Sequence, residues 1–324
     1  MNSRAQTLER SVRDQSGAAK DASDSARARR SRNRSSQLAA WAFLAPLTIY
    51  LLAFYAYPLY RNLDLSLRNY TVYSFVHGGA PFTGFANYSA VIHDATFAKA
   101  LINTLLFTFV SLLFQFAIGM ALAVFFAQHF RLSPILRALF LVPWLLPLIV
   151  SASTWAWMLD SGSGVVNYGL HLIGIGPVNW LTDPHWALAS VIIANIWIGI
   201  PFNLVLLYSG IQAIPSTLNE AAAIDGANSW TKFRRITFPL LRPVSAITLM
   251  LGMVYTLKVF DIIWIMTKGG PVDASTTFAT WSYQLGFGNL LPEFGPGAAV
   301  GNLLVVMALV AGLVYIRVQR RQAA

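Results

Sequence analysis

The sequence contains no cysteine, and only 11% of its 324 residues are charged. The absence of cysteine excludes a disulfide framework, a thiolate metal site and a cysteine nucleophile. A soluble domain usually has about 25% charged residues, whereas this chain is 56% hydrophobic with a mean hydropathy of +0.55. It has too few charged side chains to cover a water-facing globule, so the composition predicts an integral membrane protein.

Motifs for bond chemistry are also missing. The five histidines are scattered, and none forms the zinc-protease pattern of two histidines flanking a glutamate. Gly164 and Gly169 have the spacing of a phosphate-binding loop, but Leu170 and His171 replace the required Lys and Ser/Thr. Ser163 lies between two glycines without a general base on a facing helix. We therefore predict no catalytic residue, no metal ion and no cofactor bound by this chain.

Six apolar runs have about the 20 residues that are needed to cross a bilayer. They cover 39–60, 101–127, 135–158, 187–211, 243–266 and 297–317. We therefore predict an all-α integral membrane protein, with a domain over 38–324 that contains six transmembrane helices. The first run ends in Tyr57, Pro58 and Tyr60 rather than in small residues, which argues against a cleaved signal peptide.

Lys and Arg are distributed unevenly between the two sides of these runs. Nine precede residue 38, and more follow the second, fourth and sixth runs: Arg131, Arg137, Lys232, Arg234, Arg235, Arg242, Arg317, Arg320 and Arg321. The loops of the other side contain only Arg61, Arg68, Lys99 and Lys268. The positive-inside rule therefore predicts that both termini are cytoplasmic. The net charge of +10 then reflects topology and not a nucleic-acid partner.

Residues 1–37 are polar and rich in Ser, Ala and Arg. Such a composition cannot bury a core, so we predict a disordered, basic, cytoplasmic N-terminal tail. Its most basic part, Arg27 to Arg34, is typical of a lipid and topology anchor. A nucleic-acid-binding arm would need folded or aromatic support, which this segment lacks.

The cytoplasmic loop between the fourth and fifth runs, at about 213–240, predicts a helix-turn-helix along the membrane surface. Ser216 is a suitable N-cap for a first helix. Gly226 breaks that helix. A second short helix follows over 230–236, and Pro239 ends it.

Within this loop, three residues separate Glu220-Ala221-Ala222 from Gly226, and nine more separate Gly226 from Ile236-Thr237-Phe238-Pro239. The pattern resembles the EAA loop of binding-protein-dependent ABC importer permeases. In that family the loop docks into a cleft of the ATP-binding subunit and transmits its closure. The resemblance implies coupling residues at Glu220, Ala221, Ala222, Asp225, Gly226, Ile236 and Pro239.

Further segments over about 40–317 resemble the maltose and glycerol-3-phosphate permease branch of that family. They are Gly84-Phe85-Ala86-Asn87-Tyr88, Asn103-Thr104, Trp197 with Pro201-Phe202, Phe260-Asp261 and Thr267-Lys268-Gly269-Gly270-Pro271. The resemblance implies a type I ABC importer permease fold in a bacterial plasma (inner) membrane. It also implies a second, homologous permease as heterodimer partner, two ATP-binding subunits that use ATP and magnesium, and an extracytoplasmic solute-binding protein.

Polar and small residues recur on one face of two of the predicted helices. They are Asn195, Gly199 and Phe202 in the fourth run, and Gly252, Tyr255, Thr256 and Val259 in the fifth. Amide and hydroxyl groups can bond to sugar hydroxyls, an aromatic ring can stack on a sugar ring, and glycine leaves room. In the maltose-permease branch these positions line the transport cavity, and the resemblance implies the same here. Ordinary helix packing remains the alternative.

Lys258 and Asp261 are ionisable groups within or near the fifth run, three residues apart. This spacing allows an ion pair on one helix face, near the outer end of the span. The alternative is that Lys258 contacts an anionic solute and belongs to the solute path.

Together these features predict a permease subunit that translocates a sugar or sugar-like solute and performs no bond chemistry itself. An ion-coupled secondary transporter is the first alternative, but it would need midplane carboxylates and two related halves. An intramembrane enzyme or assembly scaffold is the second, and the missing nucleophile and base argue against an enzyme.

Overall fold

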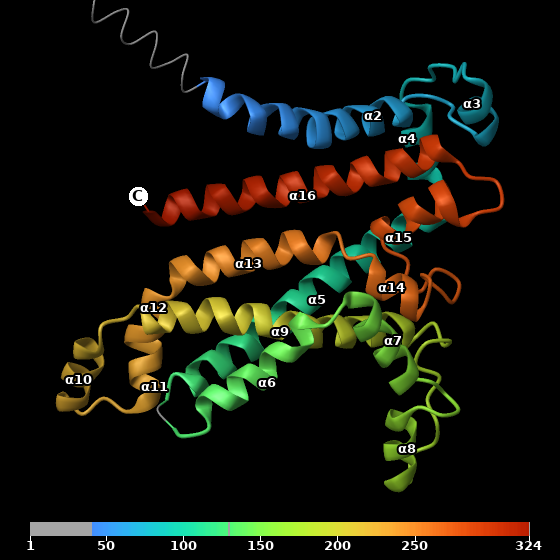
Figure 1. Ribbon diagram of the computed structural model, residues 1–324. Coiled ribbons are helices and arrows are strands. Elements are labelled where there is room, and N and C mark those ends of the chain that lie inside the picture. The colour runs from blue at the N-terminus through green and yellow to red at the C-terminus, as the bar shows by residue number, and fades with distance from the viewer. Residues whose placement is uncertain (1–40, 129, 324) are drawn as a thin grey trace, which may run out of the picture. The chain divides into compact units, whose positions relative to one another are not determined.

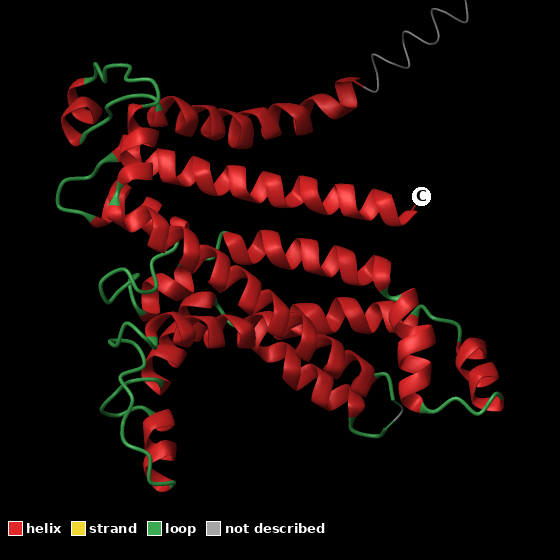
Figure 2. Ribbon diagram, turned by 180° about the vertical axis from the view of Figure 1, so that it is seen from behind, coloured by secondary structure: helices red, strands yellow, loops and turns green. Residues whose placement is uncertain are grey.

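The computed structural model describes residues 41–128 and 130–323. The tail predicted over 1–37 lies outside the described residues. Nearly all regular structure in the described part is helical (Figures 1 and 2), with only two isolated β-bridges. The predicted all-α class is therefore confirmed.

Four helices are long and apolar enough to cross a membrane: Trp41–Ser66, α5 (Ala95–Phe126), α9 (Ala187–Gln212) and α16 (Phe294–Ala323). Two bent pairs raise the number to six if each pair counts as one span. One pair is α6 (Ser133–Leu145) and α7 (Leu148–Met158), bent by 95°; the other is the segment Ser229–Leu240 and α13 (Arg242–Leu257), bent by 67°.

Two predicted spans are therefore not continuous helices. The run at 135–158 breaks after Leu145 because Pro147 cannot donate a backbone hydrogen bond and disfavours helical geometry at the residue before it. The run at 243–266 divides into α13, which ends at Leu257, and α14 (Asp261–Met266). A hydropathy window cannot detect such breaks, because the apolar composition continues through them.

The chain separates into two compact units at Asn62 and Leu63. The described part of the first unit, 41–62, is helical and contains a π-helical turn, η1 (Leu52–Ala56), before α2 (Tyr57–Ser66) begins. The second unit contains the remaining helices. At one end of it lie α10–α12 and the end of α16; at the other lie α3, α8, α14 and α15 (Figure 1).

The pair of α5 and α9 forms the centre of the second unit. Each helix has a glycine where the other places a polar side chain. A Cβ added at Gly119 of α5 would lie 2.5 Å from the Cβ of Asn203, and one added at Gly199 of α9 would lie 2.3 Å from the Cδ of Gln115. Small residues allow such close approach of membrane helices, so these two helices interlock.

The end that contains α3 (Val72–His77), α4 (Ala86–His93), α15 (Phe278–Tyr283) and η3 (Gln284–Gly288) packs around the start of α16. A buried cluster there includes Val91, Phe278, Trp281 and Val300. The Ser282 hydroxyl donates to the Gly297 carbonyl at 2.7 Å. This packing fixes the start of α16 against α4 and α15.

Candidate functional site

The loop between α9 and α13 folds as a helix-turn-helix at one end of the second unit (Figure 1). Its elements are α10 (Ser216–Ile224), α11 (Ser229–Lys232), η2 (Phe233–Thr237) and α12 (Phe238–Leu240). The structure therefore has the two short helices that the sequence predicts at about 213–240.

The turn between these helices is built on Gly226, which has a φ of +77°. The amide of Gly226 donates to the Ala223 carbonyl at 3.1 Å, and the amide of Ala227 donates to the Ala222 carbonyl at 2.9 Å. These two bonds are the Schellman pattern that closes a helix C-terminus. Glycine adopts this left-handed conformation without strain, so Gly226 breaks the helix as predicted.

Two details of this loop differ from the sequence prediction. Ser216 is the first helical residue and not the N-cap; Pro215 is the cap residue and has no side-chain hydrogen bond. Pro239 does not end the second helix, which continues to Leu240. The π-helical turn η2 directly precedes Pro239. In this turn the Phe238 amide donates to the Phe233 carbonyl. The wider turn lets the helix continue although Pro239 has no amide hydrogen to donate.

The predicted coupling residues fall into two groups. Glu220, Ala221, Asp225 and Gly226 are exposed on α10 and its turn, with Ala222 half-buried, whereas Ile236 and Pro239 are half-buried in the second helix. Two large apolar side chains flank the first group in the open: Ile224 is 87% exposed and Trp230 is 67% exposed. The turn thus presents apolar and acidic groups together on a free surface.

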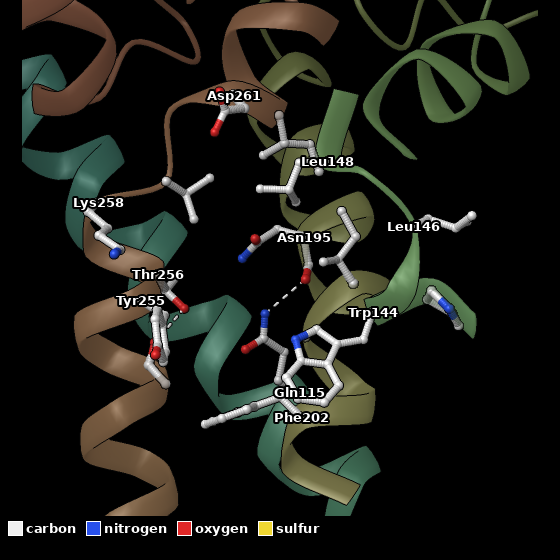
Figure 3. Close-up of a pocket in the computed structure, with 16 residues that line it drawn as sticks. Gln115, Trp144, Leu146, Leu148, Asn195, Phe202, Tyr255, Thr256, Lys258 and Asp261 are labelled. Carbon is white, nitrogen blue, oxygen red and sulfur yellow. Dashed lines mark hydrogen bonds between the residues drawn. The ribbon is translucent and has the colours of Figure 1, made fainter. Parts of the chain in front are cut away.

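A cavity of about 510 Å³ lies between α5, α6, α9 and α13 (Figure 3). All eight residues of the predicted solute path line it: Asn195, Gly199, Phe202, Gly252, Tyr255, Thr256, Lys258 and Val259. The structure therefore brings the two predicted faces together around one space. Their role as a solute path stays a prediction.

Amides lie at the centre of this cavity. The Gln115 Nε2 donates to the Asn195 carbonyl at 2.8 Å, and Figure 3 shows the two side chains near each other. The Asn195 Nδ2 is buried without a hydrogen-bond partner. Thr256 is already satisfied, since its hydroxyl donates to the Gly252 carbonyl at 2.7 Å. The cavity thus contains one amide donor that a ligand or water can pair after a small rotation.

Aromatic rings form one wall of the cavity. The ring centroids of Trp144 and Phe202 are 6.2 Å apart, and those of Phe202 and Tyr255 are 5.8 Å apart, both edge to face. The Lys258 Nζ lies 5.1 Å from the centroid of Tyr255, which is within the range of a cation–π contact. Such a wall can stack against an apolar sugar face.

The absence of a side chain at Gly199 leaves room for Gln115 of the neighbouring helix. The space over it is filled by the Gln115 amide, 2.3 Å from an added Cβ. Over Gly252 the Leu112 Cδ1 lies 2.8 Å from an added Cβ. These glycines therefore line the cavity and also make room for side chains of α5.

The predicted ion pair between Lys258 and Asp261 does not form among the described residues, whose ion pairs join Arg68 with Asp64 and His185 with Asp183. The reason is the helix break: α13 ends at Leu257, and Asp261 is the first residue of α14. The three-residue spacing therefore does not place the two groups on one helical face. Both nevertheless line the cavity.

Gln115 and Trp144 are among the lining residues that were not predicted from the sequence. Gln115 is a polar side chain within an apolar run, which is a recognised signal for a functional position in a membrane helix. Trp144 lies between Pro143 and Pro147, and that pair of prolines indicates a break where an aromatic can turn inward. Whether side chains of separate helices face the same cavity, however, depends on how the helices pack, which sequence spacing does not show.

Asn103 and Thr104 contact the loop between α14 and α15 and do not line the cavity. The Asn103 Nδ2 lies 3.0–3.1 Å from the carbonyls of Asp273, Ala274 and Thr276. The Phe278 amide donates to the Thr104 hydroxyl at 3.0 Å. This loop contains non-glycine residues with positive φ, so the two polar side chains hold a strained backbone in place.

Ser163 has a structural partner. Its amide and its hydroxyl donate to the Asp160 carboxylate at 2.7 and 2.9 Å. The Ser163 amide is the main reason that the pKa of Asp160 is lowered, and the Ser163 hydroxyl and the Gly162 amide add to it. A carboxylate with a lowered pKa is a weak general base, so this pair does not form an activated nucleophile.

Comparison with known families decides between the possible classes of membrane protein. Residues 115–323 match the family described as binding-protein-dependent transport system inner membrane component. The chain belongs to this family. The permease therefore functions as a multi-pass membrane subunit of an ABC importer, as the coupling-loop pattern predicted.

Several relatives of the permease have assigned transport systems. The trehalose/maltose transport system permease protein of Thermococcus litoralis is 36% identical over 86% of this chain and 92% of that protein. The lactose transport system permease protein of Rhizobium radiobacter is 33% identical over 83% and 90%. A solved bacterial ABC transporter that imports the acidic polysaccharide alginate has a TM-score of 0.77 at 27% identity, over 90% of this chain and 98% of that chain.

Proposed function

We propose that this permease translocates a sugar or sugar-like solute through the cavity between α5, α6, α9 and α13. The support is chemical: amides, hydroxyls and an aromatic wall surround one space, and the relatives include trehalose/maltose and lactose permeases. A disaccharide needs hydrogen-bond partners for its hydroxyls and a ring for its apolar face, and this cavity has both.

The permease is half of a translocation pathway. A second, homologous permease closes the pathway as a heterodimer partner, and an extracytoplasmic binding protein delivers the solute. In support of the latter, a structural relative was solved in complex with a periplasmic protein that holds an alginate pentasaccharide. Two separate ATP-binding subunits hydrolyse ATP with magnesium, and this chain performs no bond chemistry.

The coupling loop at 213–240 receives the movement of one ATP-binding subunit. Its exposed turn around Gly226 presents Ile224 and Trp230 as apolar contacts, with Glu220 beside them. The loop continues into α13, whose far end reaches Tyr255 and Lys258 at the cavity. Closure of the ATP-binding subunits therefore moves a wall of the solute path.

The permease lies in the bacterial inner membrane with both termini in the cytoplasm. Lys and Arg accumulate on the side of the coupling loop. The end of α16 lies at the same end of its unit as that loop (Figure 1), which supports a cytoplasmic C-terminus.

The cavity is tested with the complete transporter in proteoliposomes loaded with ATP. We expect Phe202→Ala to lower uptake of trehalose, maltose or lactose by about two- to tenfold, because a ring contact is worth about 0.5–1.5 kcal/mol. The control is Phe109→Ala, an exposed phenylalanine on α5 outside the cavity. Unchanged uptake by the Phe202 variant, or uptake without the binding protein and ATP, would contradict the proposal.

A further inference from the structure

A second cavity, of about 470 Å³, lies where α5 and α9 end and α6 begins. It is separate from the proposed solute path, with which it shares no lining residue. Arg131, Arg137, Gln128, Gln212 and Tyr208 contribute its polar surface. We call it the Arg137 cavity.

Arg137 is held in place but incompletely paired. Its Cζ lies 4.4 Å from the ring centroid of Tyr208, which fixes the plane of the guanidinium by a cation–π contact. Its Nε is closed to solvent and has no hydrogen-bond partner. An unsatisfied buried donor is costly, especially on a charged group, so the site lacks an acceptor.

The missing acceptor is an anion. Among residues 41–128 and 130–323, no Asp or Glu lines the Arg137 cavity. Arg131 adds a second positive charge, and the amides of Gln128 and Gln212 can donate further hydrogen bonds. A planar guanidinium with neighbouring donors matches the oxygens of a phosphate group.

The position of the cavity selects the source of the phosphate. Arg137 lies four residues into α6, which is about 6 Å from the start of the helix; on the proposed function and its topology, with the start of α6 at the cytoplasmic surface, this is near the depth of a lipid headgroup. One turn further along the same face, Phe140 is 40% exposed. Its ring lies 5.7 Å from that of Phe126, which lines the cavity. An apolar surface therefore continues from the basic site, as an acyl chain requires and a free phosphate ion does not.

We propose that the Arg137 cavity binds the phosphodiester of an anionic membrane lipid, with Arg137 and Arg131 as its partners. Basic pockets between membrane helices on the cytoplasmic side commonly bind such headgroups. The lipid pairs with the guanidinium group of Arg137 and lies beside Gln212, the last residue of α9, which the coupling loop follows directly.

The test uses the complete transporter in nanodiscs of phosphatidylcholine that contain phosphatidylglycerol. Native mass spectrometry counts the phosphatidylglycerol retained by each transporter after transfer to detergent. We expect Arg137→Gln to lower retention about tenfold or more, since a hydrogen bond to a charged group is worth about 1.5–3 kcal/mol. Arg137→Lys should retain part of the lipid. The control is Arg317→Gln, which removes an exposed charge on α16 outside the cavity and should change nothing.

Three results would overturn the assignment. They are unchanged phosphatidylglycerol retention by Arg137→Gln, equal retention of phosphatidylcholine, and displacement of the lipid by millimolar inorganic phosphate that then binds alone. Independently of the lipid measurement, a cross-link between position 137 and a carboxylate of a partner subunit would assign the acceptor to that subunit and would also overturn the proposal. If Arg137→Gln fails to assemble, Arg131→Gln is measured instead, because Arg131 is exposed. Unchanged phosphatidylglycerol retention by Arg131→Gln then contradicts the proposal.

Discussion

At the scale of single residues, the contact of Gly199 with Gln115 sets the position of the Gln115 amide in the cavity. We predict that Gly199→Ala lowers uptake strongly, because the new Cβ would lie 2.3 Å from the Gln115 Cδ and would push that amide out of place. Uptake by proteoliposomes, normalised to assembled transporter, measures the effect. Gly169→Ala is the matched control, since nothing lies within 4 Å of a Cβ there.

A second substitution separates the clash from other causes. Gly199→Ala combined with Gln115→Ala removes the colliding amide, so uptake per assembled transporter should be higher than that of Gly199→Ala alone. If the double variant takes up no more than Gly199→Ala alone, the contact with Gln115 is not the reason for the defect.

The six predicted cavity residues within α9 and α13 could be found from the sequence because they follow helical spacing, which places side chains on one face. Lys258 and Val259 lie just past the end of α13, so helical spacing does not explain their place at the cavity. Gln115 could not be assigned to the same space, since only packing shows that α5 turns it towards Gly199. The pairing of Lys258 with Asp261 was predicted wrongly for a related reason. Helical spacing has no meaning across a break, and no proline or glycine at 258–260 announces this one.

At the scale of elements, the coupling loop depends on the left-handed turn at Gly226. We predict that Gly226→Val reduces uptake and the binding of ATP-binding subunits, because a β-branched residue at a φ of +77° costs about 1–2 kcal/mol or more. Co-purification of the subunits and ATP-driven uptake measure both effects. Gly226→Asn should be nearly normal, since asparagine tolerates this conformation. Equal defects in the two variants would show that a side chain, and not the backbone, is the problem.

The helix-turn-helix itself was predictable because glycine and proline are local signals. Its exact limits were not. Pro239 lies within a helix that a π-helical turn keeps continuous, and such turns arise from strain that a sequence pattern does not display. The 95° bend between α6 and α7 was likewise hidden inside a run of uniform hydropathy, although Pro143 and Pro147 indicated a kink.

At the scale of the whole molecule, topology can be tested directly because the chain has no cysteine. We predict that Glu220→Cys is labelled by a membrane-impermeant maleimide only from the cytoplasmic side, and Gly176→Cys only from the other side. Both positions are exposed. Labelling of right-side-out and inverted vesicles gives the result. Labelling of both positions from one side would contradict a membrane crossing by α9, which lies between them.

The interlocked glycines of α5 and α9 have a mechanical consequence. Because side chains of each helix fill the space over a glycine of the other, α5 and α9 cannot slide along each other. The cavity must therefore open by movement of the helix on its opposite side. That helix is α13, which begins at the 67° bend beside α12 and spans 16 residues, or about 24 Å. A pivot of about 10° at the bend swings the distant tip, with Tyr255 and Lys258, by roughly 4 Å over that length. A small rotation at the bend thus moves the cavity end of α13 by more than the size of a hydroxyl group.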